Sequence, residues 1–450
     1  MTATSAALSP LERGLNLFTE VRRGEAASAL MLALNIFLIL TAYYMMKPVR
    51  EGLILSVDGG AELKSYLAAG QALLLLGAVP LYAKLASRYA RRALINRVTW
   101  FFAACLAAFY GLALVGAPIG VVFYLWVGIF NLMVPAQFWA FANDVYTPET
   151  GKRLFVVVAF GASAGAVFGS FAAGRLIDPQ GLFGLDIFQL LLVSGTVLLL
   201  SLVLTNTVES RERTTAKADD SRKAPDEPLG KAGAFQLVIE SRYLLLIALL
   251  MLLLNWVNTT GEYILGRTVK EAAPGMLAAD PALAPDVATF ITAFYADFFT
   301  VVNIAGLLLQ LFIVSRVLKY FGVRIAIFVL PLIALGGYLI AAFYPVLSIV
   351  RWVKTAENAT DYSLQNTVRQ VLFLPTTREE KYKAKQAIDT FFVRSGDVLS
   401  ALLVFVGTGL LALSTQQFAL INAGLVMVWL LLAFLIGREH RHLVSGRSAA

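Results

Sequence analysis

Long apolar runs alternate with short polar segments along the whole chain. Twelve runs are each long enough to cross a bilayer, because a spanning helix needs about 20 mostly apolar residues. They lie at residues 27–46, 64–83, 94–116, 119–142, 153–174, 184–206, 243–265, 288–314, 323–343, 346–374, 386–412 and 416–437. Backbone groups in lipid must bond within their own segment, which favours helices and excludes open strands. The pattern predicts an all-α membrane protein with twelve transmembrane helices.

Composition agrees with this prediction. Hydrophobic residues make up 58% of the chain and charged residues only 15%, whereas a soluble chain carries roughly 25% charged residues. The runs are unbroken and lack the alternating segments of about 10 residues that are typical of a membrane barrel.

The polar stretch at 207–241 divides the runs into two groups of six. It is charged, contains proline and glycine, and has few bulky apolar residues, which is typical of a mobile linker. We therefore expect an N-terminal six-helix bundle at 1–206, a cytoplasmic linker at 207–241 and a C-terminal six-helix bundle at 242–450.

An internal repeat supports this division. Residues 31–51 align with residues 251–271 at a constant offset of 220. The identical pairs are Met31/Met251, Leu32/Leu252, Leu34/Leu254, Asn35/Asn255, Tyr43/Tyr263, Val49/Val269 and Glu51/Glu271. Both copies end in a basic-x-Val-basic-Glu pattern. Parallel halves of this kind are typical of major-facilitator-type transporters, which bind substrate between the halves. The sequence thus predicts two six-helix pseudo-repeat bundles with a major-facilitator-like fold.

The basic residues are distributed unevenly between the two sides of the predicted membrane. Of the 37 Lys and Arg residues, alternate assignment puts 28 in inside segments, 6 in outside segments and 3 within spans. This positive-inside bias predicts that both termini are cytoplasmic. The net charge of +8 then reflects orientation, so we expect no nucleic-acid partner. The amino end lacks the short apolar core of a cleavable signal, and we therefore expect the protein to lie in a bacterial inner membrane. We also expect it to be a monomer.

Small residues recur every four positions in the fifth run, at Gly161, Gly165 and Gly169. This spacing lets two helix backbones approach closely. It predicts either a sliding seam used in alternating access or plain close packing.

The tenth run carries an unusual number of charges. On a straight helix at 100° per residue, its five charged side chains fall within an arc of about 120°. They are Arg351, Lys354, Glu357, Asp361 and Arg369. Charges inside a span cost at least about 2.5 kcal/mol each on insertion scales, so they face a cavity or a partner. This stripe therefore predicts a polar interior face.

Other charged and polar residues lie near the ends of the first, fourth, seventh and eleventh runs. Cationic side chains at several depths suit a phosphate-bearing solute. The candidate substrate-binding residues are Lys47, Arg50, Asn143, Glu262, Arg267, Lys270, Arg351, Lys354, Glu357, Asp361, Tyr362, Lys385 and Asp389. The alternative is internal ion pairing that locks helices together, for example between Lys354 and Glu357 or between Lys385 and Asp389.

The sequence lacks the usual groups of enzyme active sites. It contains no G-x-x-x-x-G-K-[ST] loop and no H-E-x-x-H motif. Its two histidines, His440 and His442, lie in the basic tail, and its one cysteine, Cys105, lies in an apolar run. We therefore expect no enzyme activity, no cofactor and no metal site.

Three segments resemble the nucleotide translocase family, the ATP/ADP exchangers of plastids and intracellular bacteria. The block at 354–397 contains the Tyr-Ser-Leu of Tyr362–Leu364, then Pro375, then a run from Glu380 to Asp389 that reads Glu-x-x-Lys-x-Lys-x-x-Ile-Asp. FWAFAND at 138–144 precedes a Lys-Arg pair, and KPVRE ends the first run. The resemblance implies nucleotide exchange, with Lys47, Arg50, Glu262 and Lys385 essential for transport. Gln365-Asn366 replaces the family's usual bulky-acidic run, which leaves the nucleotide preference open.

The sequence therefore predicts a secondary active transporter of an anionic small molecule, most simply an ATP/ADP-type antiporter working by alternating access. Two alternatives stay open. One is proton-coupled transport of another phosphorylated or organic anion, with a carboxylate carrying the proton. The other is a nontransporting membrane sensor or scaffold.

Overall fold

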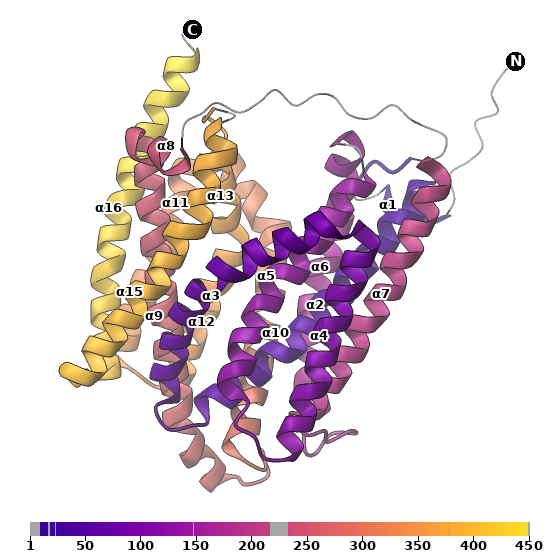
Figure 1. The fold of residues 1–450 in the computed structure, drawn as a ribbon. Coiled ribbons are helices and arrows are strands. Elements are labelled where there is room, and N and C mark those ends of the chain that lie inside the picture. The colour runs from indigo at the N-terminus through magenta and orange to yellow at the C-terminus, as the bar shows by residue number, and fades with distance from the viewer. Residues whose placement is uncertain are drawn as a thin grey trace, which may run out of the picture. The chain divides into compact units, whose positions relative to one another are not determined.

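The computed structural model describes residues 10–16, 19–22, 24–146, 148–216, 233–377 and 379–448. Within these ranges every regular element is a helix, as Figure 1 shows. The predicted all-α class is confirmed for this part of the chain. Residues 1–9 of the amino end and residues 217–232 of the predicted linker lie outside the described residues.

The described elements are α-helices interrupted in places by short π-helical segments. The α-helices are α1 Pro10–Leu15, α2 Glu25–Leu55, α3 Gly60–Arg88, α4 Arg91–Leu114, α5 Gly120–Val145, α6 Pro148–Ile177, α7 Gln189–Ala216, α8 Ala234–Glu240, α9 Arg242–Ala279, α10 Val287–Leu309, α11 Ser315–Phe343, α12 Leu347–Thr360, α13 Asn366–Leu372, α14 Lys385–Ala387, α15 Val393–Phe405 and α16 Thr415–Ser448. The π segments are η1 Gln310–Val314, η2 Asp361–Gln365, η3 Glu380–Ala384, η4 Ile388–Phe392 and η5 Val406–Leu410.

Nine helical stretches in the described ranges are long and apolar enough to cross a membrane. They are Glu25–Leu55, Arg91–Leu114, Gly120–Val145, Arg153–Ile177, Gln189–Arg211, Arg242–Ala279, Val287–Phe343, Lys385–Leu410 and Thr415–Arg441. The chain is thus an integral, multi-pass membrane protein.

The stretch Val287–Phe343 contains the predicted eighth and ninth spans. It is broken at Gly322, whose φ of 71° and ψ of 172° are not helical. The predicted second and tenth spans coincide with α3 and with α12–η2–α13, which are not among the nine stretches. In the predicted tenth span, the π segment η2 directly follows α12, so α12 alone has only 14 residues and is too short to cross a membrane.

The chain groups into two compact units. Unit 1 comprises Met1–Leu53, Leu76–Ala224 and Ala282–Thr300, and unit 2 comprises Ile54–Leu75, Pro225–Pro281 and Val301–Ala450. These units follow the halves of the sequence, except that residues 54–75 and residues 282–300 each group with the opposite half. The predicted boundaries at 206 and 242 stay a prediction.

Aromatic side chains form the centre of unit 1. Trp126 on α5 stacks with Phe123 at a ring-centroid distance of 5.9 Å and meets Phe102 of α4 at 5.3 Å. Phe109 and Phe130 pack around the same indole. All of these rings are buried, and their combined apolar surface holds α4 against α5.

In unit 2, α9 packs against α12, α15 and α16, and α11 packs against α12 and α16. Tyr263 of α9 and Phe418 of α16 meet edge to face at 4.9 Å. Asn422 of α16 donates to the carbonyl of Val257 at 3.0 Å. This packing brings α9, α11 and α12 together around the polar residues described below.

The glycines of the fifth run lie directly against α2 within unit 1. A Cβ atom at Gly161, Gly165 or Gly169 would overlap the backbone of Ala33, Phe37 or Thr41, respectively. The close packing predicted from the four-residue spacing is therefore present. Sliding along this seam stays a prediction.

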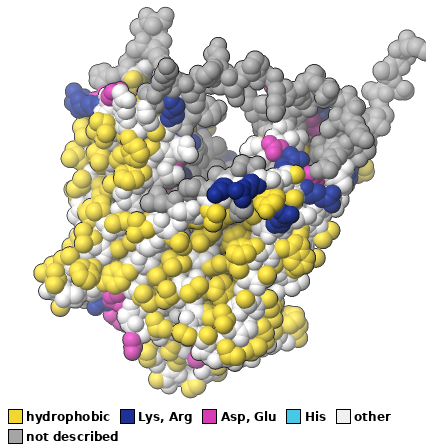
Figure 2. All heavy atoms as spheres, viewed as in Figure 1, with side chains coloured by type: hydrophobic (Ala, Val, Ile, Leu, Met, Phe, Trp, Pro, Cys, Tyr) yellow, Lys and Arg dark blue, Asp and Glu magenta, His cyan; other side chains and the backbone are white. Residues whose placement is uncertain are grey.

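Many large apolar side chains are solvent-exposed in the absence of lipid, among them Trp100, Phe101, Leu114 and Phe343. Figure 2 shows hydrophobic side chains over most of the visible face. An apolar surface this extensive is expected where lipid covers the protein.

Candidate functional site

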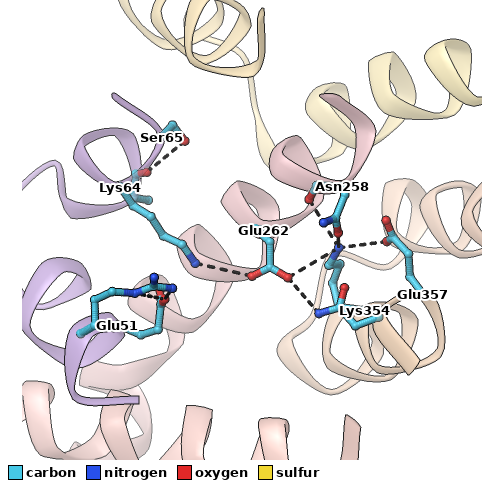
Figure 3. Close-up of polar contacts among 10 residues, drawn as sticks. Glu51, Lys64, Ser65, Asn258, Glu262, Lys354 and Glu357 are labelled. Carbon is cyan, nitrogen blue, oxygen red and sulfur yellow. Dashed lines mark hydrogen bonds and ion pairs between the residues drawn. The ribbon is translucent and has the colours of Figure 1, made fainter. Parts of the chain in front are cut away.

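The candidate site lies within unit 2, where α9 and α12 face each other. Asn258 and Glu262 share one face of α9 because they are four residues apart, and Lys354, Glu357 and Asn358 share one face of α12 in the same way. Figure 3 shows that the side chains of Asn258, Glu262, Lys354 and Glu357 point toward one another. We call the set the Lys354 cluster; its members are Lys64, Asn258, Glu262, Tyr338, Lys354, Glu357 and Asn358.

Lys354 is the centre of this cluster. Its side chain is only 1% exposed, and its Nζ lies 3.1 Å from Glu357 Oε2 and 3.7 Å from Glu262 Oε1. Nζ also donates to Asn258 Oδ1 at 2.9 Å. A lysine ammonium has three donors, and these three acceptors come from two different helices. A buried cation is stable here because it is paired and hydrogen-bonded.

Glu357 is held equally firmly. Tyr338 of α11 donates its hydroxyl to Glu357 Oε2 at 2.6 Å, and the carboxylate is almost fully buried. Gly261 of α9 makes this arrangement possible, because a Cβ there would overlap the Tyr338 hydroxyl and approach Lys354 Nζ.

Glu262 is the more accessible carboxylate, with a side chain 22% exposed. Asn358 donates to its Oε1 at 3.0 Å, and Lys64 at the start of α3 lies 3.5 Å from its Oε2. Glu262 therefore bridges two lysines. The cluster contains two lysines and two glutamates, so its formal charge is balanced. An entering phosphate can compete with the carboxylates for the ammonium groups.

Lys64, Asn258 and Tyr338 were not among the residues predicted from the sequence. Lys64 lies at the start of the second predicted run and Asn258 lies within the seventh, and a polar position in a span was the only available signal. A buried tyrosine is too common in membrane helices to give any signal.

Arg267 and Lys270 contact protein acceptors in unit 2. Arg267 bonds Glu271 Oε1 at 2.8 Å, the Tyr263 hydroxyl at 3.2 Å and the carbonyl of Leu413 at 3.0 Å. Lys270 donates to the carbonyl of Val57. The structure thus gives both predicted site residues structural contacts at the end of α9.

The predicted stripe of five charges is interrupted by a π segment, and its confinement to one face stays a prediction. Segment η2 follows α12, and a π turn holds more residues than an α turn. The residues after it are therefore rotated relative to Lys354 and Glu357. Asp361 and Tyr362 line a separate cavity of about 330 Å³ within unit 2. We call it the Gln365 cavity; its lining includes Met251, Asp361, Tyr362, Gln365, Asn366 and Arg369.

The proposed pairing of Lys385 with Asp389 is wrong. Lys385 Nζ donates to Gln370 Oε1 at 2.6 Å, while Asp389 faces Arg369 at 4.0 Å. Segment η4 begins at Ile388, between the two residues, so their α-helical i, i+4 spacing is lost. By contrast, the predicted pair of Lys354 and Glu357 is present.

Arg351 of α12 and Asn143 of α5 are two further predicted site residues. The guanidinium of Arg351 lies 5.8 Å from the ring of the neighbouring Trp352. Asn143 is exposed near the end of α5, beside Asp144, which pairs with Arg91 at 3.2 Å.

Lys47 and Arg50 belong to unit 1. Lys47 Nζ lies 3.8 Å from the centre of the Phe299 ring and 5.1 Å from that of Tyr44. Arg50 bonds Glu51 and lies 4.7 Å from the Tyr124 ring. Cations over aromatic faces are stabilised by the ring quadrupole.

No group of three or more His, Cys, Asp or Glu side chains that could hold a metal ion occurs among the residues that the structure describes.

Comparison with known proteins adds a family to this geometry. The family model described as TLC ATP/ADP transporter matches residues 119–440. The chain is 24% identical to ADP,ATP carrier protein 1 of Chlamydia pneumoniae over 67% of this chain and 64% of that protein. It is 20% identical to ADP,ATP carrier protein 5 of Rickettsia bellii over 62% of this chain and 59% of that protein. The chain spans less than two thirds of the length of these relatives.

Solved structures share the fold. The nucleoside transporter NupG matches with a TM-score of 0.63 at 13% identity, covering 91% of this chain and 98% of that chain. The human organic anion transporter MFSD10 matches with a TM-score of 0.58 at 12% identity, covering 92% of this chain and 100% of that chain. These likenesses confirm a major-facilitator-like fold and carry no conclusion about substrate.

Proposed function

The chain belongs to the TLC ATP/ADP transporter family, and from this premise we propose that it is a secondary transporter that exchanges nucleotides across a membrane. The family match over residues 119–440 supports the substrate class. The observation in the structure that carries the mechanism is Lys354, a buried ammonium shared between Glu262 and Glu357.

The Lys354 cluster supports exchange through its charge balance. Without substrate, the two lysines are neutralised by the two glutamates. A nucleotide phosphate that binds Lys354 or Lys64 takes over this role and releases a carboxylate toward water, most readily Glu262 because it is the more exposed. A ligand shifts a conformational equilibrium only by its differential affinity for the two states. Exchange follows if a phosphate-loaded cluster crosses the occluded state more easily than an empty one.

Several finer features belong to this proposal. The transporter has twelve spans, with α3 and α12–η2–α13 crossing the membrane and Gly322 separating two further spans. Both termini are cytoplasmic in a bacterial inner membrane, as the positive-inside bias supports, and the protein acts as a monomer. Glu262, Lys354 and Glu357 form the core of the site. The other predicted residues, including Lys47, Arg50 and Lys385, extend it.

Uptake of labelled ATP into proteoliposomes tests the proposal. We expect saturable uptake only when the vesicles contain ADP or ATP. Lys354→Met should abolish this uptake, whereas Lys319→Met, an exposed lysine on α11, should leave it unchanged. Absence of saturable uptake with internal ADP would overturn the nucleotide assignment. Uptake driven by a pH gradient into empty vesicles would instead support proton-coupled anion transport, for which Glu262 is the accessible carboxylate.

A further inference from the structure

The Gln365 cavity has no role in the charge-exchange mechanism described above. It lies between α9 and the run η2–α13 within unit 2, with a volume of about 330 Å³. Met251 contributes an apolar wall from α9, and Asp361, Gln365 and Arg369 contribute polar groups from the other side. A cavity of this size with a few polar groups has the character of a ligand site.

Gln365 is the unusual residue of this cavity. It is only 2% exposed, yet neither its Nε2 nor its Oε1 has a hydrogen-bond partner among the described residues. Buried amides are normally satisfied, because an unpaired buried polar group carries a desolvation penalty. A side chain held in this state needs a partner from outside the protein.

The backbone around Gln365 is also irregular. Gln365 is the last residue of the π segment η2, and single-turn π segments inside α-helices occur frequently at functional sites. Asp361, the first residue of η2, and Arg369, which follows the segment, both line the cavity. The irregular segment therefore lies at a second polar site on the same helical run.

The chemistry of the cavity suits a flat, uncharged, hydrogen-bonding ring. Asp361 and Arg369 contribute one negative and one positive charge to the lining, so it has no excess of positive charge to hold a phosphate. The Gln365 amide presents a donor beside an acceptor, which matches nucleobase edges such as N6 and N7 of adenine. Tyr362, which is 42% exposed, offers a ring face for stacking.

We propose that the Gln365 cavity holds the base of the transported nucleotide and that Gln365 is the residue that reads its edge. This inference rests on the proposed function, because it names a subsite for the same substrate. The phosphates are held elsewhere, by the lysines of the Lys354 cluster. Along the helix, Gln365 follows Lys354 by eleven residues, or about 16 Å at ~1.5 Å per residue, a distance that an extended nucleotide can bridge.

Binding to the purified full-length protein in detergent tests the assignment. Dissociation constants are measured by calorimetry for ATP and for tripolyphosphate, which lacks the base. Gln365→Met keeps the length of the side chain and removes its polar atoms. We expect ATP to bind about 10-fold more weakly, as for loss of one bidentate base contact, and tripolyphosphate to bind unchanged.

Gln137→Met is the matched control. Gln137 is a second buried glutamine, 6% exposed, whose Nε2 has no hydrogen-bond partner among the described residues. It lines a unit 1 cavity of about 20 Å³, which has room for one water molecule but not for a base. This substitution should change neither dissociation constant. Gln365→Asn, which keeps the amide on a shorter side chain, provides a second variant if Gln365→Met lowers the melting temperature of the unliganded protein.

Three outcomes would overturn the inference, and they differ from one another. Unchanged ATP affinity in Gln365→Met and Gln365→Asn would mean that the cavity holds only water, while nucleotide exchange would stand. Equal weakening of ATP and tripolyphosphate would place Gln365 with the phosphates. Failure of the unsubstituted protein to bind any nucleotide would overturn the proposed function together with this inference.

Discussion

Lys354 carries three side-chain contacts at one buried ammonium, and its removal tests how strongly the cluster depends on it. Lys354→Met leaves Glu357 buried without its cation, although Tyr338 still donates to it. Breaking a buried pair by removing one partner typically costs about 3–5 kcal/mol. We therefore expect a loss of this order in the free energy of unfolding, measured by denaturant titration in detergent.

Two further variants separate this effect from general damage. Glu357→Gln added to Lys354→Met should restore part of the lost free energy of unfolding, because residue 357 then carries no buried charge without a partner. Glu271→Gln is the control. It removes the ion pair between Arg267 and Glu271, in which the Glu271 side chain is 58% exposed, and exposed pairs contribute only about 0–1 kcal/mol. Strictly additive effects of Lys354→Met and Glu357→Gln would contradict the coupling.

At the residue scale, the sequence predicted which charges are buried better than it predicted their partners. The pair of Lys354 and Glu357 followed from helical spacing alone. The other two partners of Lys354, Asn258 and Glu262, come from α9, which is distant in the sequence, and no local pattern indicates such a contact. Asn35 and Asn255, the repeated asparagines, show the same limit: one bonds Thr205 and the other Asp397, so identical positions acquired different partners.

At the scale of elements, the positions of the helices were predictable and their irregularities were not. Apolar runs located the helices, because lipid requires about 20 apolar residues per span. Segments η2 and η4 had no sequence signature, yet η2 interrupts the predicted charged stripe and η4 begins between Lys385 and Asp389. A π turn depends on packing along the whole helix, so a uniform period of 100° per residue could not reveal it.

The close contact between α6 and α2 predicts that one added methyl group at Gly165 destabilises the protein. Gly165→Ala would press a Cβ against the backbone of Phe37, and overpacking of this kind costs typically about 1–3 kcal/mol. We expect a lower melting temperature for the purified protein. Gly111→Ala on α4 is the control, since nothing lies within 4 Å of its Cβ position. A Gly165→Ala protein as stable as the Gly111→Ala protein would show that the helices separate readily.

Gly322 provides a second test at this scale. Its φ of 71° and ψ of 172° lie in a region that is essentially restricted to glycine and costs other residues about 1–3 kcal/mol. Gly322→Ala should therefore destabilise the protein, as followed by thermal unfolding. Gly336→Ala lies on the same helix, also with open space around its Cβ position, and should be neutral or slightly stabilising. Equal behaviour of the two variants would exclude a fixed break at Gly322.

At the scale of the whole molecule, the repeat predicted a duplicated architecture, and the matched structures confirm the major-facilitator-like fold. The grouping of residues 54–75 and 282–300 with the opposite half was not predictable. Both segments follow the repeated motif at the start of their half, so equivalent segments of the two halves group with the opposite unit. Sequence identity along one chain identifies equivalent segments but does not show which unit each one packs against.

The orientation of the chain can be tested at two pairs of exposed positions that flank single predicted spans. Ser210 and Gln180 flank the sixth span, and Lys319 and Tyr344 flank the ninth. Each is replaced by cysteine in a Cys105→Ser background, and intact cells are treated with a membrane-impermeant maleimide. Because 28 of the 37 basic residues fall on one predicted side, we expect Gln180→Cys and Tyr344→Cys to be labelled from outside. Ser210→Cys and Lys319→Cys should react only after permeabilisation. Labelling of Lys319→Cys together with Tyr344→Cys in intact cells would mean that the helix after Gly322 does not cross the membrane, and the twelve-span topology would be wrong.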